Sequence, residues 1–333
     1  MRPGLFNTMA TALAALMSMP AIPLATHVTP IDELARLRDA LGGATLPRLF
    51  MKRDDLLSFG CGGNKVRKLQ TVIAEAKAAG ADTLITCGGL QSNHARATAA
   101  AGAALGLRVV LVLNGEPPKT PVANTRLDLL FGADVRYVAG RDARAPMMQS
   151  VADEERRAGR RPVVVPLGAS TATGALGFAR GVAEILAAGL KPDVIIHASS
   201  SGGTQAGLVA GCRLFGLATK VIGVSADEPA PRLGALIGGL IGDMAVRLGT
   251  RPETIGAGDV DVDDSQVGAG YGIPTPGSAE ALELVARREG ILLDPVYTAK
   301  AMAGLVTRLR AGAFSSGSTV LFWHTGGQVG FFA

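Results

Sequence analysis

A single lysine, Lys65, follows a glycine run in the segment GCGGNKVRKL, residues 60–69, at the expected start of a helix. A lysine amine can act as a nucleophile or carry protons when burial suppresses its charge and its position is fixed. The glycines let the backbone approach another group closely. Taken alone, the segment is equally compatible with a turn that has no chemical role.

Two further loops have the residue types that bind anions. GGLQSN, residues 88–93, puts Ser92 and Asn93 at the expected start of an alanine-rich helix, where side chains and unbonded amides suit a carboxylate. SSSGGTQAGL, residues 199–208, is a glycine-rich turn whose amides and hydroxyls could hold one phosphate. There is no GxxxxGK[ST] motif, and no GxGxxG with an acidic residue at the right distance, so a nucleotide site is not expected.

Hydroxyl groups also follow apolar segments near the end of the chain. Tyr271 lies in GAGYGIP, Tyr297 and Thr298 lie in DPVYT, and Thr325 lies in WHTGGQ. A lone residue of these types is usually packed or exposed without a chemical role. Together with the loop lysine and the two anion loops, they make up the set that pyridoxal phosphate requires, namely a Schiff-base lysine, amides for its phosphate and a partner for its ring nitrogen.

The elements that must position these loops alternate along the chain. Apolar segments without clean alternation predict strands buried on both faces, as in parallel sheets covered by helices. They are RLFMKR, TLITCG, VVLVLN, DVRYVA, PVVVPLG, VIIHASS, VIGVSA, ILLDPV and TVLFWHT. Helices are expected between them, with starts at Pro121 and Ser278 and ends at Gly80, Gly106, Gly132 and Gly290. The alternation predicts an open α/β fold, in which ligands bind beyond the carboxyl ends of strands.

The same pattern predicts two domains, each an open, mostly parallel sheet flanked by helices. Residues 61–165 are expected to form a smaller α/β domain that carries the QSN loop, and residues 1–60 with 166–333 a larger domain that cradles the cofactor. The cofactor is expected in the cleft between them. A chain of 333 residues is long enough for two domains.

Composition limits the class of protein. The net charge is +5, but the basic residues are spread along the chain and aromatics make up only 4%, so no nucleic-acid partner is expected. Cys61, Cys87 and Cys212 lack metal-ligand spacing, which predicts reduced thiols in a cytoplasmic protein and no metal site. Prolines interrupt the apolar N-terminal segment, so we expect a cytoplasmic extension there and neither a signal peptide nor a membrane span.

The motifs GGNKVRKL, LQSNHAR, GALGF, SSGGTQAGL, GYGIP, DPVYTAK and HTGG, in this order and spacing, carry a resemblance that covers nearly the whole chain after about residue 20. The chain resembles the fold-type II (tryptophan synthase β-like) pyridoxal phosphate enzymes, and among them the D-cysteine desulfhydrase and 1-aminocyclopropane-1-carboxylate (ACC) deaminase family. The resemblance implies pyridoxal 5'-phosphate as the cofactor, a small amino acid as the substrate and a homodimer.

The resemblance also implies roles for the matching residues. Lys65 would form the Schiff base and later transfer protons, and Asn93 would bond the phenolic oxygen of the cofactor. The residues implied to hold the phosphate are Lys68, Ser200, Ser201, Gly202, Gly203 and Thr204. The residues implied to contact the substrate are Ser92, Asn93, His94 and Tyr271, and catalysis would use Ser92, Tyr271 and Tyr297 besides Lys65. Thr298 or Thr325 would face the pyridine nitrogen.

Position 298 bears on the substrate. In the deaminases a glutamate follows the DPVY motif, whereas Thr298 stands here, as in the desulfhydrase-like members. A hydroxyl makes the ring a weaker electron sink than a carboxylate does, and elimination of a good leaving group needs less carbanion stabilisation than opening a cyclopropane. We therefore expect α,β-elimination, most simply of D-cysteine to pyruvate, ammonia and sulfide, and His94 agrees with this.

Other positions keep alternatives open. Gln205 resembles the deaminases, and Ala269 stands where the family usually has proline. L-cysteate sulfo-lyase and ACC deaminase therefore remain alternatives on the same scaffold. Alternatives of another class are a non-catalytic α/β small-molecule binder and a nucleotide-dependent oxidoreductase, which explain the glycine loops but leave Lys65 without a role.

Overall fold

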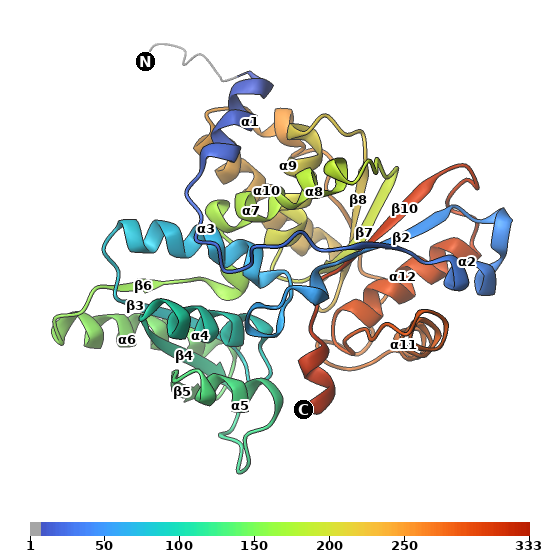
Figure 1. Cartoon of the computed structure of the whole chain (residues 1–333). Coiled ribbons are helices and arrows are strands. Elements are labelled where there is room, and N and C mark those ends of the chain that lie inside the picture. Colours follow the sequence, from blue (N-terminus) through green and yellow to red (C-terminus); the bar gives the residue numbers. More distant parts are fainter. Residues whose placement is uncertain (1–7) are drawn as a thin grey trace.

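The protein, as a computed structural model that describes residues 8–333, contains one six-stranded and one four-stranded sheet (Figure 1). The larger sheet has the order β1-β2-β10-β7-β8-β9, and only the β1–β2 pair is antiparallel. Its strands are β1 (Ile31–Glu33), β2 (Arg48–Arg53), β7 (Val194–Ser199), β8 (Lys220–Ser225), β9 (Asp261–Asp263) and β10 (Thr319–His324). The smaller sheet, of order β5-β4-β3-β6, is wholly parallel. Its strands are β3 (Thr83–Gly89), β4 (Arg108–Asn114), β5 (Asp134–Val138) and β6 (Pro162–Val164).

Helices cover both faces of the six-stranded sheet. Ile195 of β7 points into a core shared with one set of helices, whereas its neighbours Val194 and Ile196 point into a core shared with another. The first set is α1 (Met9–Ser18), α7 (Ala172–Ala179), α8 (Gly181–Ala187), α9 (Gly203–Leu214) and α10 (Ala230–Leu248). The second set is α2 (Ala35–Leu41), α11 (Pro276–Glu289) and α12 (Thr298–Arg310). Burial on both faces explains why the strand segments are apolar without alternation.

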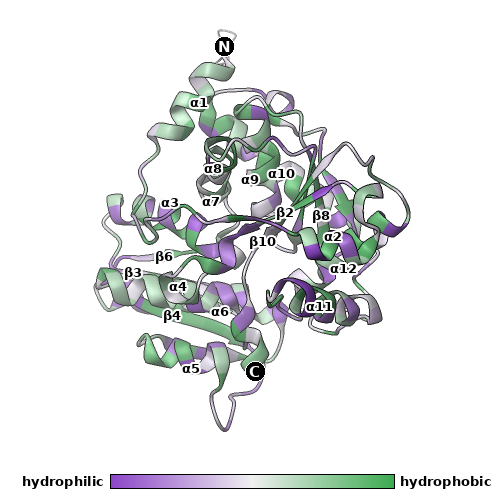
Figure 2. Ribbon diagram, turned by 45° about the vertical axis from the view of Figure 1, so that its right-hand side comes forward, coloured by the Kyte–Doolittle hydropathy of each residue, from purple (hydrophilic) through white to green (hydrophobic). Residues whose placement is uncertain are grey.

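The four-stranded sheet is built in the same way. Leu84 of β3 and Leu111 of β4 pack toward α3 (Lys65–Ala78) and α4 (Asn93–Leu105), and Ile85 and Val110 pack toward α6 (Arg144–Arg157). Helix α5 (Ala123–Leu130) lies beside α4. Figure 2 shows β4 as hydrophobic over most of its length, while α6 carries hydrophilic residues. The fold class predicted from the sequence, α/β with mostly parallel sheets flanked by helices, is confirmed.

The predicted strand in ILLDPV, residues 291–296, is wrong. The carboxylate of Asp294 accepts hydrogen bonds from the amides of Val296, Tyr297 and Thr298, at 3.0, 2.9 and 2.7 Å. These bonds turn the chain into α12 before it can pair with a sheet. Strands β1 and β9 are not among the predicted strands, because their sequences, IDE and DVD, are not apolar segments.

Two predicted helix starts are displaced. Helix α5 begins at Ala123 rather than at Pro121, and α11 begins at Pro276 with Thr275 as its cap. Ser278 instead completes a capping box with Thr275 through reciprocal bonds of 2.8 and 3.0 Å. The four glycines predicted to end helices all adopt the left-handed conformation.

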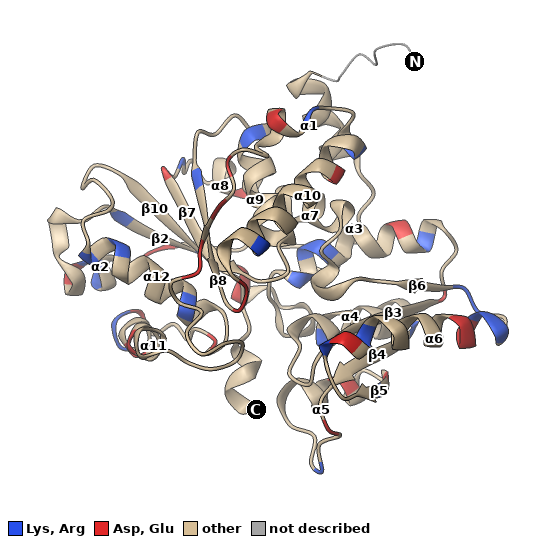
Figure 3. Ribbon diagram, turned by 180° about the vertical axis from the view of Figure 1, so that it is seen from behind, with Lys and Arg blue, Asp and Glu red and all other residues tan. Residues whose placement is uncertain are grey.

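Helix α1 packs on the body of the protein. Ala12 and Leu16 lie in the core, and Arg180 donates to the Leu16 carbonyl at 2.8 Å. The first seven residues of the predicted N-terminal extension lie outside the described part of the chain. Within that part, no helix combines the length and the apolar character that crossing a bilayer requires. Basic and acidic residues both lie along α6 (Figure 3).

The division into residues 61–165 and the remainder stays a proposal. Helix α3 falls within the smaller proposed domain, yet it also packs closely on α7. A Cβ at Gly177 of α7 would lie 2.3 Å from Thr71 Oγ1, and Thr71 donates to the Thr173 carbonyl at 2.9 Å. Helix α3 therefore joins the two sheets.

Candidate functional site

A cavity of about 640 Å³ is lined by loops that follow strands of both sheets. Most of the side chains predicted to form the site line it: Lys65, Ser92, Asn93, His94, Ser200, Ser201, Gly202, Thr204, Tyr271, Tyr297 and Thr325. Three predicted residues, Lys68, Gly203 and Thr298, lie behind this lining. The structure thus brings together loops that are more than 200 residues apart.

Lys65 is the first residue of α3, and its Nζ donates to Asn64 Oδ1 at 3.0 Å. Burial, and then the positive charge of Arg96, lower the pKa of Lys65 from 10.5 to about 8, while Asp294 acts in the opposite direction. A lysine with such a pKa is partly neutral near physiological pH. The amine can therefore serve as a nucleophile and as a proton carrier.

The glycines before Lys65 are required by close contacts. Gly62 and Gly63 have φ values of 74° and 96°. A Cβ at Gly62 would lie 2.5 Å from the Leu57 carbonyl oxygen, and one at Gly63 would lie 2.9 Å from that of Thr325. Cys61 also has a left-handed φ of 63°, an uncommon conformation for a residue with a side chain. The loop places Lys65 at the cost of this local strain.

The glycine turn at the start of α9 has the features of a phosphate site. Gly202, with φ 77°, caps the helix without a side-chain bond, and the amide of Gly203, the first residue of α9, donates to Ser170 Oγ at 3.3 Å. Lys68, only 1% exposed, donates to the Gly168 carbonyl and to Ser170 Oγ, both at 3.2 Å. Burial, and then Lys65, place the pKa of Lys68 well below 10.5.

An anion bound in this turn would balance the positive charge of the buried Lys68 ammonium. Ser170 Oγ also donates to Ser201 Oγ at 2.8 Å, and a Cβ at Gly203 would lie 2.7 Å from Ser170 Oγ and 3.0 Å from Lys68 Nζ. Only glycine leaves room there for the cation and the hydroxyl to approach the turn. These residues fit the phosphate of the predicted cofactor.

Gly203→Val should therefore weaken cofactor retention, because the new side chain displaces Lys68 and Ser170 from the turn. We expect at least a tenfold rise in the dissociation constant for pyridoxal phosphate, which is about 1.4 kcal/mol, measured by absorbance titration. The matched control is Gly234→Ala on α10, where nothing lies within 4 Å of an added Cβ. Equal affinity in both variants would remove the turn from the cofactor site.

Three predicted site residues at the start of α4 line the cavity, namely Ser92, Asn93 and His94. Ser92 caps the helix, and its Oγ accepts from the amide of Ala95 at 3.1 Å. Asn93 Oδ1 accepts from Asn124 Nδ2 at 3.0 Å, which fixes the amide plane. His94 Nε2 lies 2.7 Å from Thr86 Oγ1. Burial, and then Lys65 and Lys68, hold the pKa of His94 well below 6.5, so the ring is neutral.

Two tyrosines, Tyr271 and Tyr297, also line the cavity. The hydroxyls of Tyr271 and Tyr297 bond to each other, and their rings meet edge to face at 5.8 Å. Burial, and then Tyr271, raise the pKa of Tyr297 well above 10, so its hydroxyl stays protonated. The Arg141 guanidinium lies 4.9 Å from the centre of the Tyr271 ring and 3.4 Å from Asp227 Oδ2. These contacts tie the small-sheet side of the mouth to the large-sheet side.

Of the two threonines proposed to face the pyridine nitrogen, only Thr325 lines the cavity. Thr298 is fully buried, and its Oγ1 both donates to Asp294 Oδ1 and accepts from the Asp294 amide, each at 2.7 Å. Thr298 therefore completes the turn into α12, and Thr325 is the better placed of the pair.

The residues of this region that sequence reasoning missed include Ser170, Arg141 and Arg144. Ser170 binds both Lys68 and Ser201, and it follows β6 as the other site loops follow their strands. Arg141 and Arg144 line the cavity from the start of α6. The position of Ser170 after a strand could have revealed it, but no local pattern distinguishes these arginines from other surface arginines.

The similarity to known proteins extends over nearly the whole chain. Residues 22–326 match the family model described as pyridoxal-phosphate dependent enzyme. The chain is 40% identical to a 1-aminocyclopropane-1-carboxylate deaminase of Burkholderia ambifaria (94% of this chain, 95% of the relative). It is 38% identical to a D-cysteine desulfhydrase of Yersinia enterocolitica (96% of this chain, 97% of the relative). The crystal structure of an ACC deaminase homologue superposes with a TM-score of 0.88 at 35% identity, covering 100% of this chain and 97% of that one.

Proposed function

Because the chain belongs to the family of pyridoxal-phosphate dependent enzymes, we propose that it catalyses an α,β-elimination on a small β-substituted amino acid, most simply D-cysteine. The family membership makes it an enzyme with this cofactor and excludes both alternatives of another class. The observation that most supports this proposal is that the Lys65 amine, whose pKa is lowered, lines the same cavity as the α9 turn and the start of α4. The bound cofactor supplies an electron sink for the charge that develops when the substrate loses its α-proton.

The surrounding residues support each part of the proposed reaction. The amides and the hydroxyl at the start of α4 would bind the substrate carboxylate, and Asn93 would bond the phenolic oxygen of the cofactor. The neutral Lys65 amine would take the α-proton, and the protonated tyrosine pair would face the departing group. Overall, D-cysteine and water would give pyruvate, ammonia and hydrogen sulfide.

Elimination is favoured over ring opening by residue 298. The hydroxyl of Thr298 is bonded to Asp294, and the three amide bonds to Asp294 hold that carboxylate in the turn. The start of α12 therefore presents Tyr297 to the cavity and no carboxylate. This supports a weaker electron sink than the deaminases have. A cytoplasmic homodimer remains part of the proposal, resting on the resemblance.

A second candidate substrate, L-cysteate, is favoured by one observation. Three arginines line the cavity, and two of them are paired with carboxylates, Arg141 with Asp227 and Arg232 with Glu228. The third, Arg144, is bonded by its Nε and Nη2 to the neutral amide oxygen of Asn114. Its positive charge could therefore bind a second anionic group of the substrate besides the carboxylate, such as the sulfonate of L-cysteate.

A keto-acid assay with D-cysteine, L-cysteine, ACC, L-cysteate and D-serine separates the candidates. We expect pyruvate with D-cysteine as the best substrate, because elimination needs the lesser carbanion stabilisation. Dominant 2-oxobutyrate from ACC would show that the inference from Thr298 is wrong. Arg144→Met provides the second test, since it should lower turnover of L-cysteate by at least about tenfold if the sulfonate binds there, and leave D-cysteine nearly unchanged.

A further inference from the structure

Arg96, on the first turn of α4, is a buried cation whose bonding is incomplete. Its side chain is 1% exposed, and its Nη2 donates to the Gly62 carbonyl at 2.9 Å. Its Nε and Nη1 have no hydrogen-bond partner among the described residues. Asp128 on α5 is also fully buried, and within the same part of the chain neither carboxylate oxygen is bonded. Burying a guanidinium with two unbonded nitrogens is energetically unfavourable and calls for a structural explanation.

The hydrogen bond from Arg96 to Gly62 comes from a different part of the fold than the other bonds that hold the Lys65 loop. The amide of Gly63 donates to the Asp54 carbonyl and that of Asn64 to the Thr325 carbonyl, each at 3.0 Å. Both acceptors follow strands of the six-stranded sheet. Arg96 instead reaches the loop from α4, whose first residues contact the cavity beside Ser92. It therefore links the lysine loop to the start of α4, where we propose that the substrate carboxylate binds.

We propose that Arg96 is a positioning residue that fixes the Lys65 loop against the start of α4 and places a buried positive charge beside that loop. The inference rests on the proposed role of Lys65. Asp128 would be the partial counter-charge that allows a guanidinium to be buried at this place.

The electrostatics agree with this geometry. After burial, Arg96 is the main group that lowers the pKa of Lys65, and Asp294 raises it. Lys68 and His94 also face Lys65, since its charge contributes to their own low pKa values. Burial raises the pKa of Asp128 to about 7, and Arg96 opposes this rise. Removing Arg96 must therefore raise the pKa of Lys65 and reduce the neutral fraction at any pH near 8.

The test measures the Lys65 amine without substrate or cofactor. The full chain, stripped of cofactor, is acetylated with acetic anhydride across neutral to alkaline pH, and labelling of Lys65 is quantified by mass spectrometry against exposed Lys77. We expect a midpoint near 8 in the wild type and an upward shift of roughly one pH unit in Arg96→Met. Arg96→Lys keeps the charge and should keep the midpoint near the wild-type value. An unshifted midpoint in Arg96→Met would overturn the proposal.

Arg96→Met leaves Asp128 buried without its counter-charge, so that variant can fail to fold. The double variant Arg96→Met/Asp128→Asn removes both charges and should show the same upward shift, with an unchanged circular dichroism spectrum. A shift in this variant supports the proposal, and no shift in the folded double variant contradicts it. Because no turnover is measured, failure of the proposed elimination would not affect the outcome.

Discussion

Lys65→Ala is expected to abolish product formation, with a loss of about 10⁴-fold or more in kcat, while the fold stays intact. The alanine can neither hold the cofactor covalently nor take the α-proton. Lys65→Arg should fail equally, because a guanidinium keeps its proton throughout the accessible pH range. The measurement is keto-acid formation at saturating cofactor, together with a thermal melt.

Lys77→Ala is the matched control for this change, because Lys77 is exposed on the same helix, α3. It should keep wild-type turnover. Turnover retained by Lys65→Ala would remove the residue from the mechanism. Loss of turnover in both variants would instead point to damage of the helix.

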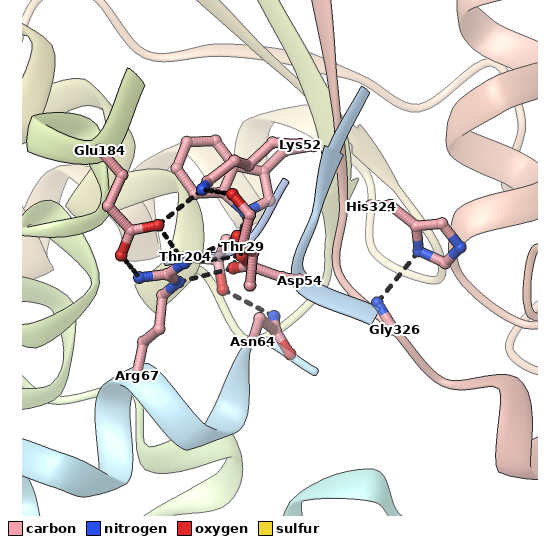
Figure 4. Close-up of polar contacts among 10 residues, drawn as sticks. Thr29, Lys52, Asp54, Asn64, Arg67, Glu184, Thr204, His324 and Gly326 are labelled. Carbon is pink, nitrogen blue, oxygen red and sulfur yellow. Dashed lines mark hydrogen bonds and ion pairs between the residues drawn. The ribbon is translucent and has the colours of Figure 1, made fainter. Parts of the chain in front are cut away.

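Arg67→Met should cause the largest loss of stability, about 3–5 kcal/mol in the free energy of unfolding. Arg67 binds both oxygens of fully buried Asp54 at 2.7 Å and Glu184 Oε1 at 2.5 Å (Figure 4). Lys52 donates to the other oxygen of Glu184 at 2.6 Å, and Trp323 Nε1 donates to Asp54 at 2.8 Å. Two cations therefore balance two anions, and removing one leaves an uncompensated buried carboxylate.

The measurement is urea denaturation, with Arg48→Met as the control. Arg48 pairs with Glu33 at 3.0 Å, but both side chains are largely in solvent, 56% and 41% exposed. We expect less than about 1 kcal/mol from its loss. If both variants lost a similar amount of unfolding free energy, the buried ion pairs of Arg67 would not be the main contribution that we assign to them. Asp54 also accepts the Gly63 amide through its carbonyl, so Arg67→Met should disturb the lysine loop as well.

The fold and the cofactor could be inferred from the sequence because their signals are local. Strands β7 and β10 are buried on both faces, which makes their segments continuously apolar, and two glycines that the backbone conformation requires precede Lys65. The strand predicted in ILLDPV is wrong because the Asp294 carboxylate accepts hydrogen bonds from three following amides. The periodicity of apolar residues does not reveal such contacts.

The details of the site depend on contacts between distant loops. Ser170 meets Lys68 and Ser201, and Arg96 meets Gly62, across 31 to 102 positions of sequence. Thr298 matched a motif at the right position, yet its hydroxyl is taken up by the turn into α12 rather than by the cavity. The substrate stays a proposal, because relatives of nearly equal identity bear the names of two different activities.

Borohydride reduction of the purified protein, followed by peptide mapping, tests the central claim most directly. The protein with its cofactor should be yellow, and reduction should bleach the colour and leave a pyridoxyl group on Lys65 alone. Lys68, three residues further along α3 and buried against Ser170, should carry none. A protein that gains no visible absorbance with added pyridoxal phosphate, or a pyridoxyl group on another lysine, would contradict the account.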